Sequence, residues 1–293
     1  MKLYAPSYYK EFKCIADKCR HSCCAGWEIS VDEKTFEKYG RLPLCEREAI
    51  LSHIDDGVIG LDGEGRCPFL DERGLCRIIS KYGEEYTSEI CREHPRFYNF
   101  LSGRAEVGLG ASCEEAARII LNSESYDDIV PIGDVEDVSE KDFDPVPDRS
   151  FIYELLKKKD ISYRKKLDRI KTKYYLPDEI FLPGSLSEKL SELEYLRQED
   201  KSIFCAEISE YNEEDATYCE RFLAYLLYRH LGEASSFDNM RARICLCILL
   251  GMLFASLLTT KVDKVEAARL ISEEIEYSED NIDSLIFDFE CDL

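Results

Sequence analysis

Apolar residues recur at helical spacing throughout the second half of the chain. From residue 151 onward they return every three or four positions, on one face of a 3.6-residue period, in segments bounded by capping residues. The pattern predicts five or six helices, which begin near Phe151, Ser187, Asn212, Asp238, Asp263 and Asp280. Such helices bury their apolar faces against each other, so residues 151–293 are expected to form an all-α domain.

One apolar run is long enough to raise the question of a membrane. Ile244–Leu258 is a run of fifteen apolar or small residues between Arg243 and Thr259. As a helix it would extend roughly 22 Å, which is short of the roughly 30 Å hydrocarbon core of a bilayer. We therefore interpret it as the central buried helix of the helical domain and predict no membrane span.

The front of the chain shows shorter elements. Small helices are predicted at Asp32–Tyr39 and Glu46–Ile54. The segment Cys67–Ile79 has two short apolar runs around Asp-Glu-Arg-Gly and predicts a β-hairpin, which would bring its two cysteines together. A turn of helix capped by Ser88 is expected to hold Cys91.

An acidic stretch separates the two halves. Residues 127–150 contain nine acidic residues and three prolines without a helical stripe, which predicts a linker or a surface crossover. The expected order is a cysteine-rich domain at 1–126, the acidic linker at 127–150 and a helical domain at 151–293. The predicted class is mainly α: a small irregular cysteine-rich metal-binding domain with a short hairpin, followed by an all-α domain.

Composition and charge narrow the function. Hydrophobic residues make up 45% of the 293 positions, which is sufficient for a packed core. No apolar leader opens the chain, so we expect a cytoplasmic protein with reduced thiols. The net charge is −22, of which −17 falls on residues 126–293. Such a surface repels phosphate backbones, which disfavours nucleic-acid partners, and it suits a basic, lysine-bearing protein.

Nine of the fourteen cysteines lie in the first 113 residues, and all of them except Cys45 are candidate metal ligands. This leaves eight candidates. They fall in two groups: Cys14, Cys19, Cys23 and Cys24, then Cys67, Cys76, Cys91 and Cys113. In a reducing compartment this density indicates metal ligands, because thiolates are the ligands that zinc and iron–sulfur clusters prefer. The spacing matches neither a zinc ribbon nor a bacterial ferredoxin nor the radical-SAM pattern. Zinc and iron–sulfur therefore both stay open, as do buried cysteines without a metal.

Two positions in this array carry further expectations. Successive side chains diverge, so Cys23 and Cys24 are expected to serve different centres, or one of them is structural. Ser112 and Glu115 form a capping-box pattern, which would place Cys113 in the first turn of a helix, where the helix dipole favours a thiolate.

Five sequence blocks together resemble a known family. They are FKCIADKCRHSCCAGWEISVD (Phe12–Asp32), CPFL, GLCRI, CREHPRFY and ASCEEAARIIL. These blocks resemble the flagellin lysine-N-methylases of the FliB type, which carry a CxxCxxCC-type cysteine-rich domain associated with zinc or iron chelation. The resemblance is strong over the front 120 residues and extends weakly to Glu220–Glu233.

The resemblance implies a cofactor, a methyl donor and an acceptor. It implies an iron–sulfur cluster, 4Fe–4S, on cysteines of this array, with zinc as the alternative. It also implies S-adenosylmethionine as the donor and a lysine of flagellin or another surface protein as the acceptor. The chain has no G-x-G-x-G loop of a Rossmann-type methyltransferase, so the donor must be held differently.

Several residues near the cysteines are candidates for the chemistry. A lysine ammonium, with a pKa of roughly 10, must lose a proton before its nitrogen can react. Glu28, Glu93 and Tyr98 are the candidate catalytic residues. His94 and Arg96 are the candidate cofactor-binding residues, with Arg96 pairing to a carboxylate of the donor. Each also has a structural alternative: solvation of the metal loop, a turn residue or a bridge to the acidic surface.

Two functions remain after the sequence analysis. The first is a protein-lysine N-methyltransferase that uses S-adenosylmethionine and an iron–sulfur cluster. The alternative is a non-catalytic module in which zinc or a cluster stabilises a domain with a small core, while the helical part binds a partner.

Overall fold

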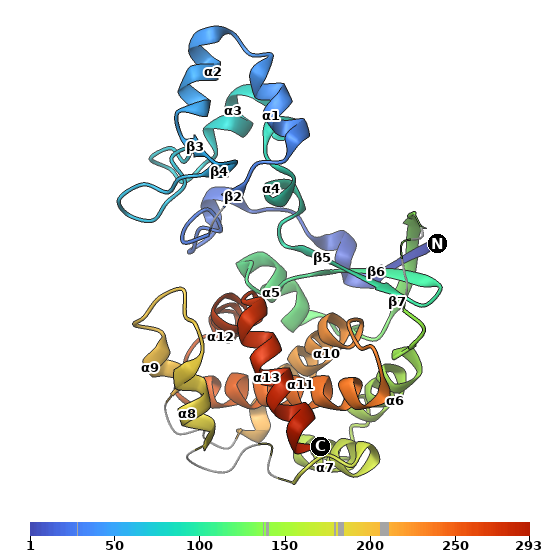
Figure 1. Ribbon diagram of the computed structural model, residues 1–293. Coiled ribbons are helices and arrows are strands. Elements are labelled where there is room, and N and C mark those ends of the chain that lie inside the picture. The colour runs from blue at the N-terminus through green and yellow to red at the C-terminus, as the bar shows by residue number, and fades with distance from the viewer. Residues whose placement is uncertain (28, 137, 139–140, 179, 181–184, 206–210) are drawn as a thin grey trace. The chain divides into compact units, whose positions relative to one another are not determined.

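The chain divides into two compact units that are not the predicted domains. The computed structural model describes every residue except 28, 137, 139–140, 179, 181–184 and 206–210 (Figure 1). The cysteine-rich unit is Lys13–Arg96, and the helical unit joins Met1–Phe12 to Phe97–Leu293. The mainly α class is confirmed. The boundary lies earlier than residue 126, because the strands and the helix between residues 97 and 126 pack with the C-terminal helices.

The cysteine-rich unit consists of short helices and two-residue strands. Its α-helices are α1 (Glu33–Gly40), α2 (Leu44–Leu51), α3 (Arg77–Tyr82) and α4 (Glu89–Glu93). Its strands are β2 (Ile29–Ser30), β3 (Ile54–Asp55) and β4 (Val58–Ile59), in the order β2-β4-β3. Its 3₁₀ turns are η2 (Ala16–Lys18) and η3 (Glu84–Tyr86).

The core of this unit is small, and its predicted hairpin is reduced. Eight buried apolar residues, Cys67 among them, form the core, with Cys24 and Cys76 packed against it. The expected hairpin is a single antiparallel bridge between Leu70 and Cys76. The Asp71 side chain accepts backbone N–H groups after the turn, and the chain then enters α3, where Ile78 is buried. Helix propagation at residue 77 therefore replaces the second strand.

The helical unit contains most of the helices. They are α5 (Glu114–Asn122), α6 (Val146–Leu156), α7 (Tyr163–Tyr174), α8 (Ser185–Glu192), α9 (Lys201–Phe204), α10 (Ala216–Leu231), α11 (Phe237–Thr259), α12 (Lys264–Ile271) and α13 (Glu279–Asp292). The 3₁₀ turns η1 (Ser7–Glu11) and η4 (Glu213–Asp215) and the π-helical turn η5 (Ser272–Glu276) complete the set. The apolar stripe that begins near Phe151 is split between two helices, α6 and α7, and Ser162 is the N-cap of the second.

Helix α11 forms the centre of this unit (Figure 1). It packs against α10, α12 and α13, and α5 packs against α10 and α12. Among the described residues it is the one helix long and apolar enough to cross a membrane, and 72% of its most apolar stretch is buried inside the unit. This burial supports its interpretation as a core helix. Its N-cap is Ser236, which accepts the N–H of Asn239, instead of the expected Asp238.

A four-stranded sheet, absent from the sequence analysis, completes the helical unit. Its strands are β1 (Lys2–Pro6), β5 (Arg96–Leu101), β6 (Arg104–Leu109) and β7 (Ile129–Asp134), in the order β5-β6-β1-β7. Strand β1 runs parallel to β6 and antiparallel to β7. The predicted acidic linker therefore contributes an edge strand and the start of α6, so part of it is regular structure.

A buried ion pair joins this sheet to the helices. The guanidinium of Arg149 on α6 donates two hydrogen bonds, of 2.7 and 2.6 Å, to the carboxylate of Glu106 on β6. Both side chains are almost completely buried, and Arg104 approaches the same carboxylate at 2.8 Å. The paired charges compensate one another, so the pair fixes the register of helix and strand.

A second buried network lies beneath the segment that leads to Cys113. The Tyr225 hydroxyl donates to Glu276 at 2.8 Å and accepts the backbone N–H of Ala111 at 3.0 Å. Arg229 also pairs with Glu276, at 3.2 Å. Gly110 lies so close that a Cβ atom there would be 2.2 Å from the Tyr277 hydroxyl. The network thus holds the turn between β6 and α5 in place.

Candidate metal centre

Backbone hydrogen bonds bring three cysteine-bearing segments together. The N–H of Cys67 donates to the carbonyl of Cys24 at 2.8 Å. The bridge between Leu70 and Cys76 folds the next segment back onto the first. Segments that are about 40 residues apart in the sequence are therefore in contact through the main chain.

The fourth segment, α4, is held by the Asp32 carboxylate, which accepts hydrogen bonds from two helix starts. Asp32 caps α1 by accepting the N–H of Thr35 at 3.0 Å, and its other oxygen accepts the N–H of Glu89 at 2.8 Å. The Thr35 hydroxyl also contacts the carbonyl of Thr87 at 3.2 Å. These bonds hold the start of α4, and α4 carries Cys91.

Electrostatic interactions between described residues link five of the predicted ligands. We call Cys23, Cys24, Cys67, Cys76 and Cys91 the five-cysteine cluster. Cys91 interacts electrostatically with Cys67, Cys76 and Cys23, and Cys24 interacts with Cys23, Cys67 and Cys91. Gathered thiolates repel each other, and a bound cation would relieve that repulsion.

The pKa values of these thiols are displaced in opposite directions. A hydrogen bond from Cys24 lowers the pKa of Cys23 to about 7, and the same bond, together with burial, raises that of Cys24. Loss of solvation raises the pKa of Cys91 to about 11 and also raises that of Cys67. The shift favours the thiolate form of Cys23, which is the form that binds a metal.

The other three predicted ligands differ in their local surroundings. Cys14 is exposed, and Cys19 follows the 3₁₀ turn η2; neither takes part in the backbone contacts that join the five. Cys113 belongs to the helical unit, where it is the N-cap of α5 instead of a residue in its first turn. Glu115 does not complete a capping box, because its carboxylate binds Arg118 at 2.7 Å.

The cysteines of the cluster lie near one another, but their side chains are not arranged around a common metal position. The cysteines form no disulfide among the described residues. In the same part of the chain, no group of three or more His, Cys, Asp or Glu side chains is arranged to hold a metal ion. Metal binding therefore requires the thiols of the five-cysteine cluster to turn toward a common ion. The chemistry of the donor set fits zinc or an iron–sulfur cluster.

The structure places the candidate catalytic and cofactor-binding residues at different points. Glu28 lies outside the described residues. Glu93 ends α4, and His94 follows it; burial lowers the pKa of His94 to about 4, so it is neutral at pH 7. Arg96 donates to the carbonyl of residue 92 at 3.1 Å. Tyr98 is exposed on β5, in the helical unit. Their proposed roles stay predictions.

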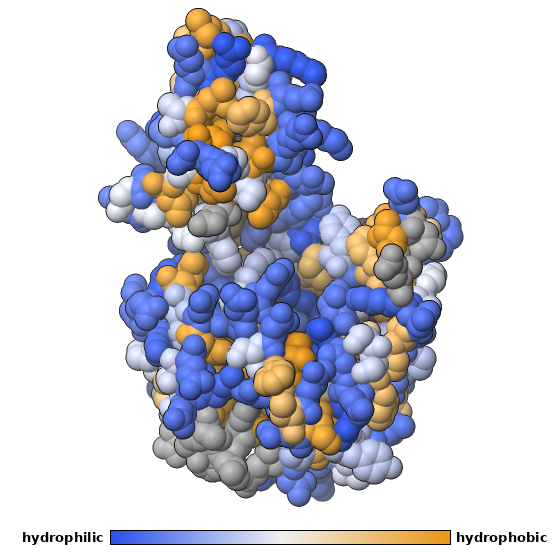
Figure 2. All heavy atoms as spheres, viewed as in Figure 1, coloured by the Kyte–Doolittle hydropathy of each residue, from blue (hydrophilic) through white to orange (hydrophobic). Residues whose placement is uncertain are grey.

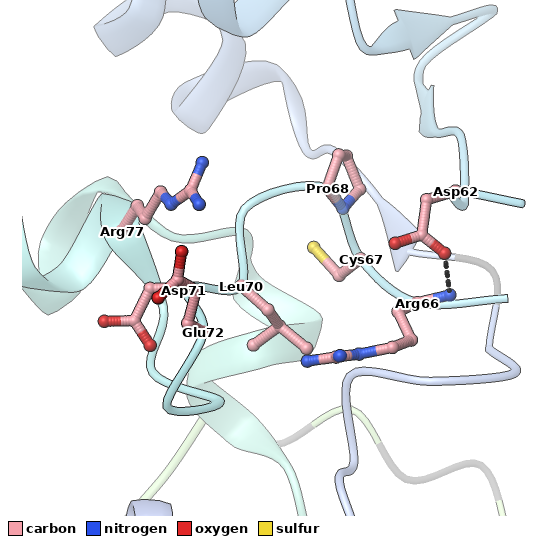
Figure 3. A pocket seen from close by; sticks show the side chains of 8 residues that line it. All are labelled: Asp62, Arg66, Cys67, Pro68, Leu70, Asp71, Glu72 and Arg77. Atoms are coloured by element: carbon pink, nitrogen blue, oxygen red, sulfur yellow. Dashed lines mark hydrogen bonds between the residues drawn. The ribbon is translucent and has the colours of Figure 1, made fainter. Parts of the chain in front are cut away.

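A pocket beside the cluster contains residues that the sequence analysis missed. Its volume is about 190 Å³, and its walls are Asp62, Arg66, Cys67, Pro68, Leu70, Asp71, Glu72 and Arg77 (Figure 3). Arg66 directly precedes Cys67, and Arg77 directly follows Cys76. An arginine adjacent to each of two predicted metal ligands was the available signal, but only the fold shows that both border one cavity.

Comparison with known proteins identifies the front of the chain. The CxxCxxCC family, described as "Putative zinc- or iron-chelating domain", matches residues 13–124. Over 131 residues, 40% of this chain, the sequence is 32% identical to the lysine-N-methylase of Salmonella choleraesuis and 31% identical to that of Salmonella typhimurium. Each of those matches spans 32% of the relative, so the chain covers about a third of these proteins.

A third relative is covered more completely. The chain is 31% identical to the flagellar biosynthetic protein FliU of Salmonella muenchen, over 75% of the length of that protein. No solved structure matches the chain.

Proposed function

The chain belongs to the family of FliU and the Salmonella lysine-N-methylases, and we propose that it transfers methyl groups from S-adenosylmethionine to lysine side chains of a protein. The acceptor in this proposal is flagellin or another lysine-bearing surface protein. The reaction takes place in the cytoplasm, where thiols stay reduced. The required metal centre is a 4Fe–4S cluster.

The five-cysteine cluster is the observation that carries this proposal. Its thiols lie inside the segment that matches the metal-chelating family. Four thiolates complete the protein ligation of a 4Fe–4S cluster. Cys67, Cys76 and Cys91 would supply three, and Cys23 the fourth, because its pKa is lowered and adjacent side chains diverge. Cys24 would then pack against the small core.

The chemistry places two demands on the residues of this chain. The acceptor ammonium must lose a proton before its nitrogen forms the new N–CH₃ bond, while the S–CH₃ bond of the donor breaks and its electron pair stays on sulfur. When bound, S-adenosylmethionine supplies the methyl group. Glu93 and Tyr98 are the proposed proton acceptors, with Glu28 as a further candidate. His94, whose pKa is about 4, is a weaker base than the task requires.

A protein acceptor also needs a surface to contact. Figure 2 shows apolar side chains gathered on a face of the cysteine-rich unit, and the exposed large apolar residues of this unit are Phe36, Leu44, Ile79 and Ile90. An exposed apolar patch on a soluble domain is a common mark of protein binding. The net charge of −22 adds long-range attraction for a lysine-bearing partner.

A methyl-transfer assay on anaerobically purified protein tests the proposal. We expect about four irons and four sulfides per chain, and a mass increase on lysines of flagellin that depends on S-adenosylmethionine. The Cys67→Ser variant should lose both iron and transfer. The matched Cys247→Ser variant, altered in the helical core, should keep both. Iron-loaded wild-type protein that transfers no methyl group to any lysine-bearing surface protein would refute the proposed activity.

The alternative function, a structural metal module, has one observation in its favour. The core of the cysteine-rich unit contains only eight buried apolar residues, and domains with small cores commonly rely on a metal for stability. Stoichiometric zinc without labile sulfide, and no absorbance at about 400 nm, would support this function. The search for activity would then move to the helical unit.

A further inference from the structure

We infer that the pocket beside Cys67 is a recognition site for an α-amino acid group, with Arg66 and Arg77 binding its carboxylate. Within the proposed function, on which this second step rests, the group is the amino-acid end of the methyl donor. The inference rests on which polar groups of the pocket are already engaged and which are available.

Two of the carboxylates in the pocket wall are engaged in local structure. Asp62 accepts the backbone N–H of Arg66 at 2.9 Å. Asp71 accepts the N–H of Leu75 at 2.9 Å with one oxygen and the guanidinium of Arg73 at 3.2 Å with the other. These bonds lower the pKa values of both carboxyls, so both are ionised at neutral pH. Their first role is to shape the two turns that border the cavity.

The two guanidinium groups are available. Arg66 interacts with Asp62 through charge, but neither Arg66 nor Arg77 donates a side-chain hydrogen bond within the described part of the chain. In Figure 3 the two side chains enter the pocket from different elements, and the sulfur of Cys67 lies between them in this view. A guanidinium offers a planar pair of donors that matches a carboxylate, so the pair selects a planar anion.

The remaining groups select against a simple anion. Glu72 is exposed at the rim, and Asp62 keeps one oxygen that accepts no hydrogen bond among the described residues. These acceptors suit an ammonium group, and they repel a phosphate. Pro68 and Leu70 provide an apolar wall for a short aliphatic stem. A carboxylate, an ammonium and an aliphatic stem together describe an α-amino acid.

The location of the pocket connects it to the metal centre. Cys67 belongs to both the pocket wall and the five-cysteine cluster. A ligand whose amino-acid end occupies the pocket is therefore anchored beside the proposed cluster. Arg66 and Arg77 are positioning residues in this scheme, because they contact the ligand far from the bond that changes.

Binding measurements on the metal-loaded protein test the inference. The probes for calorimetry are S-adenosylhomocysteine, free methionine and 5′-methylthioadenosine, which lacks the amino-acid end. Removing one charged hydrogen-bonding group should weaken binding about 10- to 100-fold. We expect Arg77→Gln and Arg66→Gln to weaken the binding of S-adenosylhomocysteine and of methionine by this factor. The affinity for 5′-methylthioadenosine should stay unchanged. The Arg77→Lys variant, which keeps the positive charge, should lose less affinity than Arg77→Gln.

Arg73→Gln is the matched control. It removes the same charge from the turn between Cys67 and Cys76, but Arg73 does not line the pocket, and its contact with Asp71 is exposed. Binding of all three probes should therefore match the wild type. Metal content and melting temperature, measured on every variant, show that each protein is folded and loaded.

Each alternative outcome has a distinct meaning. Unchanged binding of S-adenosylhomocysteine and methionine in both pocket variants would overturn the inference. Weaker binding of flagellin, with binding of S-adenosylhomocysteine unchanged, would assign the carboxylate to the protein substrate and overturn the donor step. In a third outcome, the wild-type protein binds methionine but not S-adenosylhomocysteine, and Arg77→Gln weakens the methionine binding. This result would support the pocket assignment and refute the proposed function.

Discussion

Replacement of Cys67 by serine tests the metal centre most directly, because the structure supplies a matched control. Cys67 is 7% exposed in the small core of the cysteine-rich unit, and Cys247 is 0% exposed in the core of the helical unit. Both substitutions exchange sulfur for oxygen at a buried site. They differ in one respect: Cys67 lies among the thiols of the five-cysteine cluster, whereas Cys247 lies in α11.

The expected magnitudes follow from burial and from ligand number. A buried hydroxyl without a full set of partners costs about 1–3 kcal/mol, so both variants should be destabilised by this amount in the metal-free protein. A structural metal contributes about 10–16 kcal/mol over four ligands, which gives about 2.5–4 kcal/mol for each. Loss of the Cys67 thiolate should therefore reduce metal affinity about 100- to 1,000-fold. Cys247→Ser should leave metal affinity unchanged.

The assay combines metal analysis with thermal unfolding of each variant, metal-free and metal-loaded. For Cys67→Ser we expect a larger loss of stability in the loaded protein than in the metal-free protein. For Cys247→Ser the two losses should be equal. Full metal content in Cys67→Ser, or equal losses in its two forms, would remove Cys67 from the ligand set and contradict the reasoning.

Three further predictions concern the helical unit. Arg149→Ala leaves the Glu106 carboxylate buried beside Arg104 alone, and should cost about 3–5 kcal/mol in denaturant unfolding; a loss below about 1 kcal/mol would contradict the buried pair. Burial opposes ionisation of Glu276, yet its pKa is held at about 2 by charge, below the ordinary 4.5. The ionised Glu276 carboxylate should therefore stabilise the fold by about 3 kcal/mol above pH 4.5, and this stability should be lost as the pH falls toward 2. The Glu276→Gln variant should lack this part of the acid dependence of stability. Gly110→Ala should cost about 1–3 kcal/mol through its contact with Tyr277, and Tyr277→Phe in the same chain should restore part of the loss, as urea midpoints would show.

The local sequence pattern predicted where the helices lie, but it predicted the wrong first residue for several of them. The stripes beyond residue 151 predicted the helices, because residues three and four apart must share a buried face. The ends depend on which polar side chain captures the first free N–H groups. Ser236 and Ser278 do so for α11 and α13, instead of the expected Asp238 and Asp280. Several serines and aspartates compete at each start, and the backbone geometry selects among them.

The candidate site shows the same limit. The resemblance to a metal-chelating family was readable from the cysteine blocks, and the family match confirms it. The sequence presented eight candidate cysteines, and the fold brings at least five of them into mutual interaction, whereas Cys113 belongs to the helical unit. Spacing along the chain says little about this, because contacts such as the hydrogen bond between Cys67 and Cys24 depend on how distant segments pair.

By itself, then, the sequence determined the mainly α class, the core role of α11 and the family of the metal-binding segment, because periodicity and ligand type are local properties. Only the tertiary structure decided that β1 and β7 complete one sheet, that the boundary falls at residue 96, and that Arg66 and Arg77 share a pocket with Cys67. Strand pairing, unit boundaries and pockets arise from contacts between residues far apart in the chain, and a linear pattern does not encode those contacts residue by residue.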